Sequence, residues 1–131
     1  MTLLELTVVI LVLLSLVALL FVGVRSWKKG SDRAQSIFTI RNAQQAVRGI
    51  QNINRAEPGD TLDNGIGLRD TIFGPSTENF ILTPVTGQLP PHPAPGVIYA
   101  GALNTYPPVG TLYIYSDNPD YNPTASEHAT W

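Results

Sequence analysis

Residues 6–24 read LTVVILVLLSLVALLFVGV, an apolar run without a charged side chain. As an α-helix this run is about 28 Å long, close to the thickness of the hydrocarbon core of a bilayer. The remainder of the chain is polar and rich in Gly, Pro, Asn, Asp and Thr, so it can bury only a small core. The 131 residues therefore predict one membrane-compatible helix joined to one small domain.

Charge is distributed unevenly along the chain. Residues 1–69 carry all eight Lys and Arg residues and five acids, a formal charge of +3, whereas residues 70–131 carry five acids and no Lys or Arg, a charge of −5. A nucleic-acid-binding surface needs clustered bases, which the acidic second half lacks. We therefore expect no nucleic acid among the partners.

The residues that most enzymes and metal sites need are scarce. The chain has no cysteine, which excludes disulfides, thiolate nucleophiles and cysteine-ligated metals. His92 lies between prolines and His128 lies near the end, and neither belongs to a zinc-binding motif. We expect no catalytic activity.

Glu5 is a carboxylate at the start of the apolar run. A charged side chain inside a membrane costs about 2.5–3.5 kcal/mol at the centre and less near the surface, so it usually has a partner. The nearest cation in the sequence is the α-amino group of Met1, about one helical turn away. A neighbouring helix, shifted by a few residues, could instead place its own amine against Glu5 and thereby fix the stagger between two copies. The alternative is a solvated carboxylate among the lipid headgroups.

The N-terminal sequence MTLLELTVVI resembles that of type IV pilins and type II secretion pseudopilins after removal of their leader. The resemblance covers Met1 as the methylated first residue, Thr2-Leu3-Leu4, Glu5 and the apolar run that follows. It implies that prepilin peptidase cleaves a leader and methylates Met1, and that Glu5 pairs with the amine of an adjacent subunit during assembly, in a site formed by Met1, Thr2 and Glu5. It also implies an inner-membrane subunit that a pilus or secretion machinery assembles with identical copies into an extracellular or periplasmic filament.

Two positions depart from the usual pilin pattern, and a third feature opposes the orientation that the resemblance implies. Position 1 is Met1 where phenylalanine is usual, and position 22 is Val22 where many pilins have a helix-melting proline. Gly23 weakens a helix by only about 1 kcal/mol, so we expect a helix that is continuous or mildly loosened around residues 15–24. Three bases follow the span and oppose the positive-inside tendency for the pilin orientation; they are Arg25, Lys28 and Lys29.

Residues 25–55 predict an amphipathic continuation of the helix, which Gly30-Ser31-Asp32 could interrupt. A stripe of Arg41, Arg48 and Arg55 is predicted on its polar side. The stripe has three interpretations: solvated side chains, contacts with acids of adjacent heads, or nucleic-acid binding, the last disfavoured by the charge distribution. The apolar residues predicted to share the opposite arc are Ile40, Ala43, Ala46, Val47, Ile50 and Ile53.

Residues 56–131 predict a head of loops and short strands. Strands are predicted at 97–100 and 111–115, with a weaker third at 79–82, and a proline-rich loop lies between. Asp117 and Asp120 are candidate calcium ligands, since major pseudopilins bind calcium in a C-terminal loop. Asx turns beside proline explain the same residues without a metal.

The sequence thus predicts an α+β fold. A long helix over about residues 1–53 would carry a small, loop-rich antiparallel sheet packed on its C-terminal half. Its segments would be a filament-core helix at 1–24, an amphipathic helix at 25–55 and a head at 56–131. The function this favours is a structural subunit of a pilus-like filament. The alternative is a single-span membrane anchor that presents a small binding domain.

Overall fold

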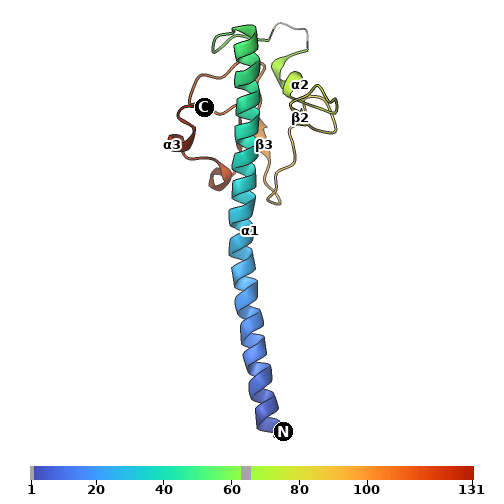
Figure 1. Cartoon of the computed structure of the whole chain (residues 1–131), viewed down its shortest axis with the longest axis vertical. Coiled ribbons are helices and arrows are strands. Elements are labelled where there is room, and N and C mark those ends of the chain that lie inside the picture. The colour runs from blue at the N-terminus through green and yellow to red at the C-terminus, as the bar shows by residue number, and fades with distance from the viewer. Residues whose placement is uncertain (1, 63–65) are drawn as a thin grey trace. The chain divides into compact units, whose positions relative to one another are not determined.

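A computed structural model describes residues 2–62 and 66–131. Its first element is α1 (Leu3–Asn54), which is continuous through Val22, Gly23 and Gly30 (Figure 1). A small domain of short helices and strands follows, so the predicted α+β class is confirmed. The chain divides into two compact units, Met1–Asp32 and Arg33–Trp131.

In the second unit, α1 contributes one buried face to the head. Ile40, Ala43 and Val47 are fully buried, as the periodicity predicts, and Ala46 and Ile50 are nearly so. Ile53 is 78% exposed, so its assignment to this face was wrong. At 100° per residue Ile53 lies at one edge of the apolar arc, and the buried face extends past the opposite edge to include polar residues instead. These polar residues are Ser36, Gln44 and Gln51.

Within its described residues, the head contains two sheets of two strands each. The strands β3 (Tyr99–Gly101) and β4 (Ile114–Ser116) are antiparallel, with Tyr99 opposite Ser116, and confirm the two main predicted strands with slightly shifted bounds. The strand β2 (Ile81–Leu82) forms at the weaker predicted position. It pairs with β1 (Phe73–Gly74) in parallel, with Phe73 opposite Ile81, instead of joining the antiparallel sheet. Residues 75–80 carry the chain back to the start of β1 before β2 begins, so the two strands run in the same direction.

Three short helices complete the head: α2 (Leu68–Ile72), the 3₁₀-helix η1 (Pro119–Tyr121) and α3 (Ala125–His128). The core lies between the buried face of α1 and the loops, and its largest fully buried side chains outside α1 come from α2, β1, β4 and the loop after β3. They are Tyr106, Phe73, Leu68, Ile72 and Ile114.

Side-chain amides bind backbone groups at and beside β4 that no neighbouring strand among the described residues binds. Gln44 of α1 donates to the Thr111 carbonyl at 3.1 Å and accepts from the Tyr113 N–H at 2.8 Å. Asn122 accepts from the Ser116 N–H at 2.7 Å and donates to the Ser116 carbonyl at 3.0 Å. Each amide thus offers one donor and one acceptor to the backbone, as a neighbouring strand would.

A third amide anchors the turn between β1 and β2. Asn79 donates to the carbonyls of Asp70 and Thr71 at 2.9 and 3.0 Å and accepts from the Ser76 N–H at 3.1 Å. Gly74 lies directly beneath this amide, and a Cβ there would lie 2.5 Å from the Asn79 side-chain oxygen. The turn is therefore tied to α2 by hydrogen bonds that only a glycine at position 74 permits.

The C-terminal end of α1 is closed by a Schellman motif. The Ala56 N–H donates to the Gln51 carbonyl at 3.0 Å and the Arg55 N–H to the Asn52 carbonyl at 3.3 Å. The motif requires a left-handed residue, usually glycine, and here Arg55 holds that position with φ 51°. A side chain in this conformation strains the backbone, because its Cβ approaches the following carbonyl oxygen.

Replacing Arg55 with glycine should therefore stabilise the head. We expect Arg55→Gly to raise the free energy of unfolding by about 0.5–1 kcal/mol, after the entropic cost of glycine is subtracted. Denaturant unfolding of the full chain in detergent, followed by near-ultraviolet circular dichroism, measures this change. Arg55→Ala removes the same charge but keeps the strained Cβ, so it should give no gain; an equal gain in both variants would show that charge, not strain, is the cause.

Candidate assembly site

In the first unit, α1 presents an apolar surface on every side. All residues from 2 to 31 are exposed, and none of the most apolar part of the helix is buried. By length and composition α1 is able to cross a membrane. The two hydroxyl groups of the apolar run are bonded within the helix, since Thr7 donates to the Leu4 carbonyl at 2.8 Å and Ser15 to the Leu11 carbonyl at 2.8 Å. Such internal bonds suit an environment that offers no water.

Glu5 and Thr2 form a capping box at the start of α1. The Thr2 N–H donates to Oε2 of Glu5 at 3.2 Å, and the Glu5 N–H donates to Oγ1 of Thr2 at 3.3 Å. The pair satisfies two N–H groups at the helix N-terminus. The Glu5 carboxylate also lies at the positive end of the helix dipole. The sequence reasoning missed this internal role, although the Thr-x-x-Glu spacing is a known capping signature.

The predicted contact between Glu5 and an N-terminal amine involves Met1, which lies outside the described residues. The structure brings Thr2 and Glu5 together, as two members of the predicted three-residue site. Both side chains are exposed at the end of the helix. The pairing with the amine of a second copy stays a prediction.

Two shallow apolar grooves run between the ridges of large side chains in the first unit. Thr7, Ile10, Leu14 and Ala18 line one groove. Leu16, Leu20, Gly23 and Trp27 line the other, where a Cβ on Gly23 would meet no atom within 4 Å. Small residues at such positions allow the backbones of two packed helices to approach closely.

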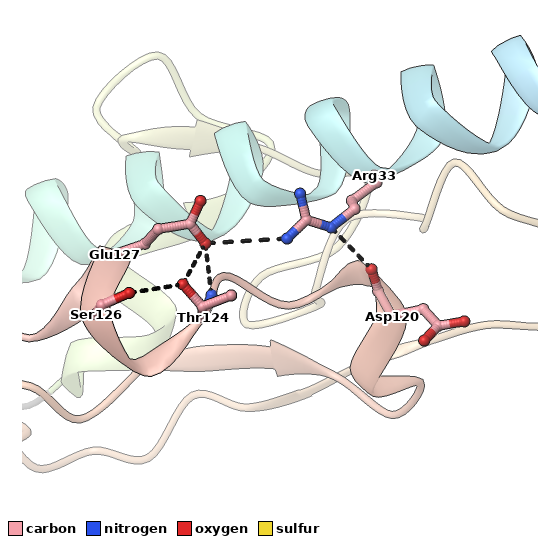
Figure 2. Close-up of polar contacts among 5 residues, drawn as sticks. All are labelled: Arg33, Asp120, Thr124, Ser126 and Glu127. Carbon is pink, nitrogen blue, oxygen red and sulfur yellow. Dashed lines mark hydrogen bonds and ion pairs between the residues drawn. The ribbon is translucent and has the colours of Figure 1, made fainter.

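In the second unit, arginines of α1 hold the C-terminal segment against the helix. Figure 2 shows Arg33 between two parts of that segment: its Nε donates to the Asp120 carbonyl at 3.1 Å and its Nη2 lies 3.9 Å from Oε2 of Glu127. Arg41 lies over the Trp131 ring, 5.5 Å from its centroid, at a distance typical of cation–π contacts.

Arg48 makes the most contacts of the three arginines. Its Nη1 donates to the Pro107 carbonyl at 2.7 Å and to the Gln51 side chain at 2.7 Å. Its Nη2 donates to the carbonyls of Pro108 and Trp131, both at 3.0 Å. Burial lowers the pKa of Arg48, but an arginine keeps its charge even so. Four charge-assisted bonds offset the cost of removing the guanidinium from water.

These contacts change the interpretation of the predicted arginine stripe. Arg48 is a structural residue bound to three carbonyls of its own chain, and Arg41 packs on Trp131, so neither is a purely solvated side chain. Arg55 instead terminates the helix. Arg33 was missed, although Arg33, Arg41 and Arg48 recur at intervals of eight and seven residues, which places them on one side of a helix.

The candidate calcium ligands take part in backbone hydrogen bonds of the head. Oδ1 of Asp117 accepts from the Ile98 N–H at 3.1 Å, and the Asp120 N–H donates to the Asn118 side chain at 3.0 Å. Within the described residues, no group of three or more acidic, histidine or cysteine side chains is placed to hold a metal. Asp117 therefore joins β4 to the segment before β3, and Asn118, not Asp120, forms the Asx-type turn beside Pro119. Calcium binding stays a hypothesis.

The two histidines lie in different surroundings. His92 accepts from the Ala94 N–H through Nδ1 at 3.0 Å, and its Nε2 lies 3.1 Å from the Ser36 hydroxyl. Its ring packs against Tyr99 and Tyr121, with centroid distances of 4.7 and 5.0 Å. The arrangement fastens the proline-rich loop to α1. His128 packs near Trp131 instead, so the two histidines do not form a common site.

Comparison with known protein families, curated proteins and solved structures finds no match for this chain.

Replacing Arg48 should weaken the whole head. We expect Arg48→Lys to lower the free energy of unfolding by about 2–3 kcal/mol, because a lysine ammonium cannot reach the same spread of acceptors and loses several charge-assisted hydrogen bonds at once. Denaturant unfolding in detergent measures the loss. Arg41→Lys is the matched control, since an ammonium can also lie over the Trp131 ring, and it should change stability by less than about 0.5 kcal/mol. Equal effects would show that the carbonyl contacts are not the cause.

The end of the chain should respond to acid through Glu127. Hydrogen bonds from the Thr124 N–H at 2.6 Å and then from its hydroxyl lower the pKa of Glu127, and Arg33 lowers it further. A carboxyl whose pKa is lower in the folded state stabilises the fold above its ordinary pKa of about 4.3, and this contribution is lost as the pH falls through the lower folded value. Unfolding should thus become easier below about pH 4.

Glu127→Gln separates this effect from the titration of other acids. Glutamine can still accept from Thr124 but does not titrate, so the variant should lose less stability than the wild type between pH 5 and pH 3. Glu57→Gln serves as a control at an exposed site. Identical pH profiles for the wild type and Glu127→Gln would contradict the assignment.

Proposed function

We propose that this chain is a structural subunit of a type IV pilus-like filament, built by packing the N-terminal parts of α1 from many copies. The observation that supports this most is the uncovered apolar part of α1 at residues 6–24, which the Glu5 carboxylate immediately precedes. In a membrane, lipid covers such a surface; outside a membrane, only other copies of the same helix keep it from water. The N-terminal resemblance to pilins and pseudopilins supports the same conclusion.

In this proposal Glu5 has two tasks. Through Oε2 it caps its own helix, and the capping box holds the carboxylate in one geometry at the helix end. Through its charge it pairs with the N-terminal amine of a neighbouring copy and sets the stagger between the two helices. A side chain that is already ordered loses less entropy when it forms the second contact.

The proposal includes the steps by which the subunit is processed and assembled. Prepilin peptidase removes a leader and methylates the amine of Met1, the subunit waits in the inner membrane, and an assembly machinery adds it to an extracellular or periplasmic filament. The partners are then identical copies and that machinery. Neither an enzymatic activity nor a nucleic-acid partner forms part of this function.

A single-span membrane anchor is the second candidate. The capping box favours it in one respect: Glu5 already has hydrogen-bonding partners within its own chain and needs no neighbour to satisfy them. In that case the helix would hold the head at a membrane surface, and the chain would not polymerise.

Two substitutions at Glu5 distinguish these functions. Glutamine preserves the capping box but lacks the charge, whereas alanine removes both. If the charge pairs with a neighbouring amine, electron microscopy of material sheared from cells should show filaments of the wild type and a loss of at least about tenfold in both Glu5→Gln and Glu5→Ala.

Other outcomes have definite meanings. Filaments that persist in Glu5→Gln but not in Glu5→Ala would leave capping as the only role of Glu5. Thr2→Ser keeps the hydroxyl and should assemble normally, which controls for changes near the processing site. Membrane-bound protein without filaments, in the wild type as in the variants, would contradict the filament and favour the anchor.

A further inference from the structure

The C-terminal segment and α1 form a hollow on the head with a volume of about 370 Å³. Its lining includes the guanidinium groups of Arg41 and Arg48, the Trp131 ring, and the amides of Gln45 and Asn52, with no acidic side chain among them. The hollow thus combines positive charge, an aromatic wall and amide groups. It suits an occupant that has an anionic group beside an apolar one.

A surface knob with those two features lies elsewhere on the same head. It is the turn of residues 76–80 together with Leu82, and it carries one acid and no base. Glu78 is exposed at the turn, and beside it Phe80 and Leu82 are 54% and 67% exposed. Apolar side chains of this size gathered at the surface often mark a contact with another protein.

The knob is also rigid. Asn79 ties the turn to the carbonyls of Asp70 and Thr71, and the Glu78 N–H donates to the Ser76 hydroxyl at 3.2 Å. Phe80 immediately precedes β2, whose pairing with β1 holds the backbone. A contact made by a segment that is already ordered requires little further loss of conformational freedom.

Knob and hollow lie on opposite sides of the head. In Figure 1, α2 and β2 lie on one side of the upper part of α1, and α3 and the C-terminus lie on the other. The knob therefore cannot fill the hollow of its own chain, but it can reach the hollow of a second copy. Two different patches that meet in this way form a heterologous contact, which repeats from copy to copy into a ring or a helical array.

We propose that the knob of one head, Glu78 with Phe80, docks into the hollow of the neighbouring head, against Arg41 and Trp131. The occupant is a second copy of this chain, and the proposal rests on the filament function. Glu78 meets the Arg41 guanidinium, because that of Arg48 already bonds to acceptors of its own chain, and the Phe80 ring packs against Trp131. The contact would join the heads around a core of packed helices and fix how each head is turned.

The absence of native cysteine makes this contact directly testable. In the full chain, Thr77→Cys places a thiol on the knob and Gln45→Cys places one at the hollow, both at exposed positions. Treated with a short bismaleimide in sheared filaments, or in membranes if none form, the double variant should give a ladder of multimers on denaturing gels. Each single variant should give none, because a heterologous contact does not bring identical sites together.

Charge reversal tests the chemistry of the contact. On the two-cysteine background, Glu78→Arg should lower the yield of the ladder at least about threefold, and adding Arg41→Glu should restore it. Glu57→Arg makes the same change in charge at another exposed site and should leave the yield unaltered. Loss in Glu57→Arg as well as in Glu78→Arg would contradict the specific pairing.

The outcomes separate this contact from the filament itself. A control pair, Thr77→Cys with Leu103→Cys, places the second thiol at an exposed site outside the hollow. Filaments seen by electron microscopy without a ladder above this control would overturn the contact and leave the filament standing. A ladder without filaments would support the contact and contradict the filament, and dimers of either single variant would overturn the heterologous arrangement.

Discussion

The hydrogen bonds of Arg48 are the interaction on which the head most depends. Its guanidinium reaches the carbonyls of Pro107, Pro108 and Trp131, and so joins α1 to a loop and to the C-terminal segment at one point. The described strands are only two or three residues long, so sheet pairing alone fastens little of this chain. Gln44, Asn79 and Asn122 act in the same manner as Arg48, each binding backbone groups that would otherwise lack a partner. The head is therefore held by side chains that reach backbone, around a modest apolar core.

Because distant side chains hold the head together, some of its features can be predicted from the sequence and others cannot. The apolar run, the helical periodicity of Ile40, Ala43 and Val47, and the β-prone residues near β3 and β4 are local patterns. The helix, the buried face and the two strands that they predict are confirmed. The roles of Gln44 and Arg48 depend on where residues more than fifty positions away return to α1, and no local pattern contains that information. The sequence therefore does not show whether an arginine or a glutamine of α1 is exposed or is buried against the loops. The same reason explains the error at Ile53, whose position on the arc does not reveal where the loops stop covering the helix.

At the N-terminus, Glu5 was predicted to be important because a charge in a membrane costs free energy and because the sequence resembles that of pilins. Its role as a helix cap follows from the Thr-x-x-Glu spacing, which was overlooked. That spacing recurs in the chain: Thr2 and Glu5 begin α1, and Thr124 and Glu127 begin α3. In both boxes the carboxylate oxygen accepts from the threonine N–H, so the charge is held close to the backbone at the positive end of a helix. At α3 the box also brings Glu127 near Arg33, a base from another part of the chain. This second box illustrates how a capping glutamate can cap its own helix and face an external cation together.

Because side-chain amides of Asn and Gln hold the loops of the head, their hydrolysis limits the chemical stability of the domain. Hydrolysis of an asparagine or glutamine amide leaves a carboxylate, which accepts hydrogen bonds but donates none and carries a negative charge. At Asn79 that new charge would face the carbonyl oxygens of Asp70 and Thr71, and at Gln44 it would lie inside the domain, 1% exposed. Amides are among the thermolabile groups of proteins. Chemical ageing, as distinct from unfolding, would thus damage the same few side chains that hold the loops together, and burial and hydrogen bonding of those amides protect the head for as long as it stays folded.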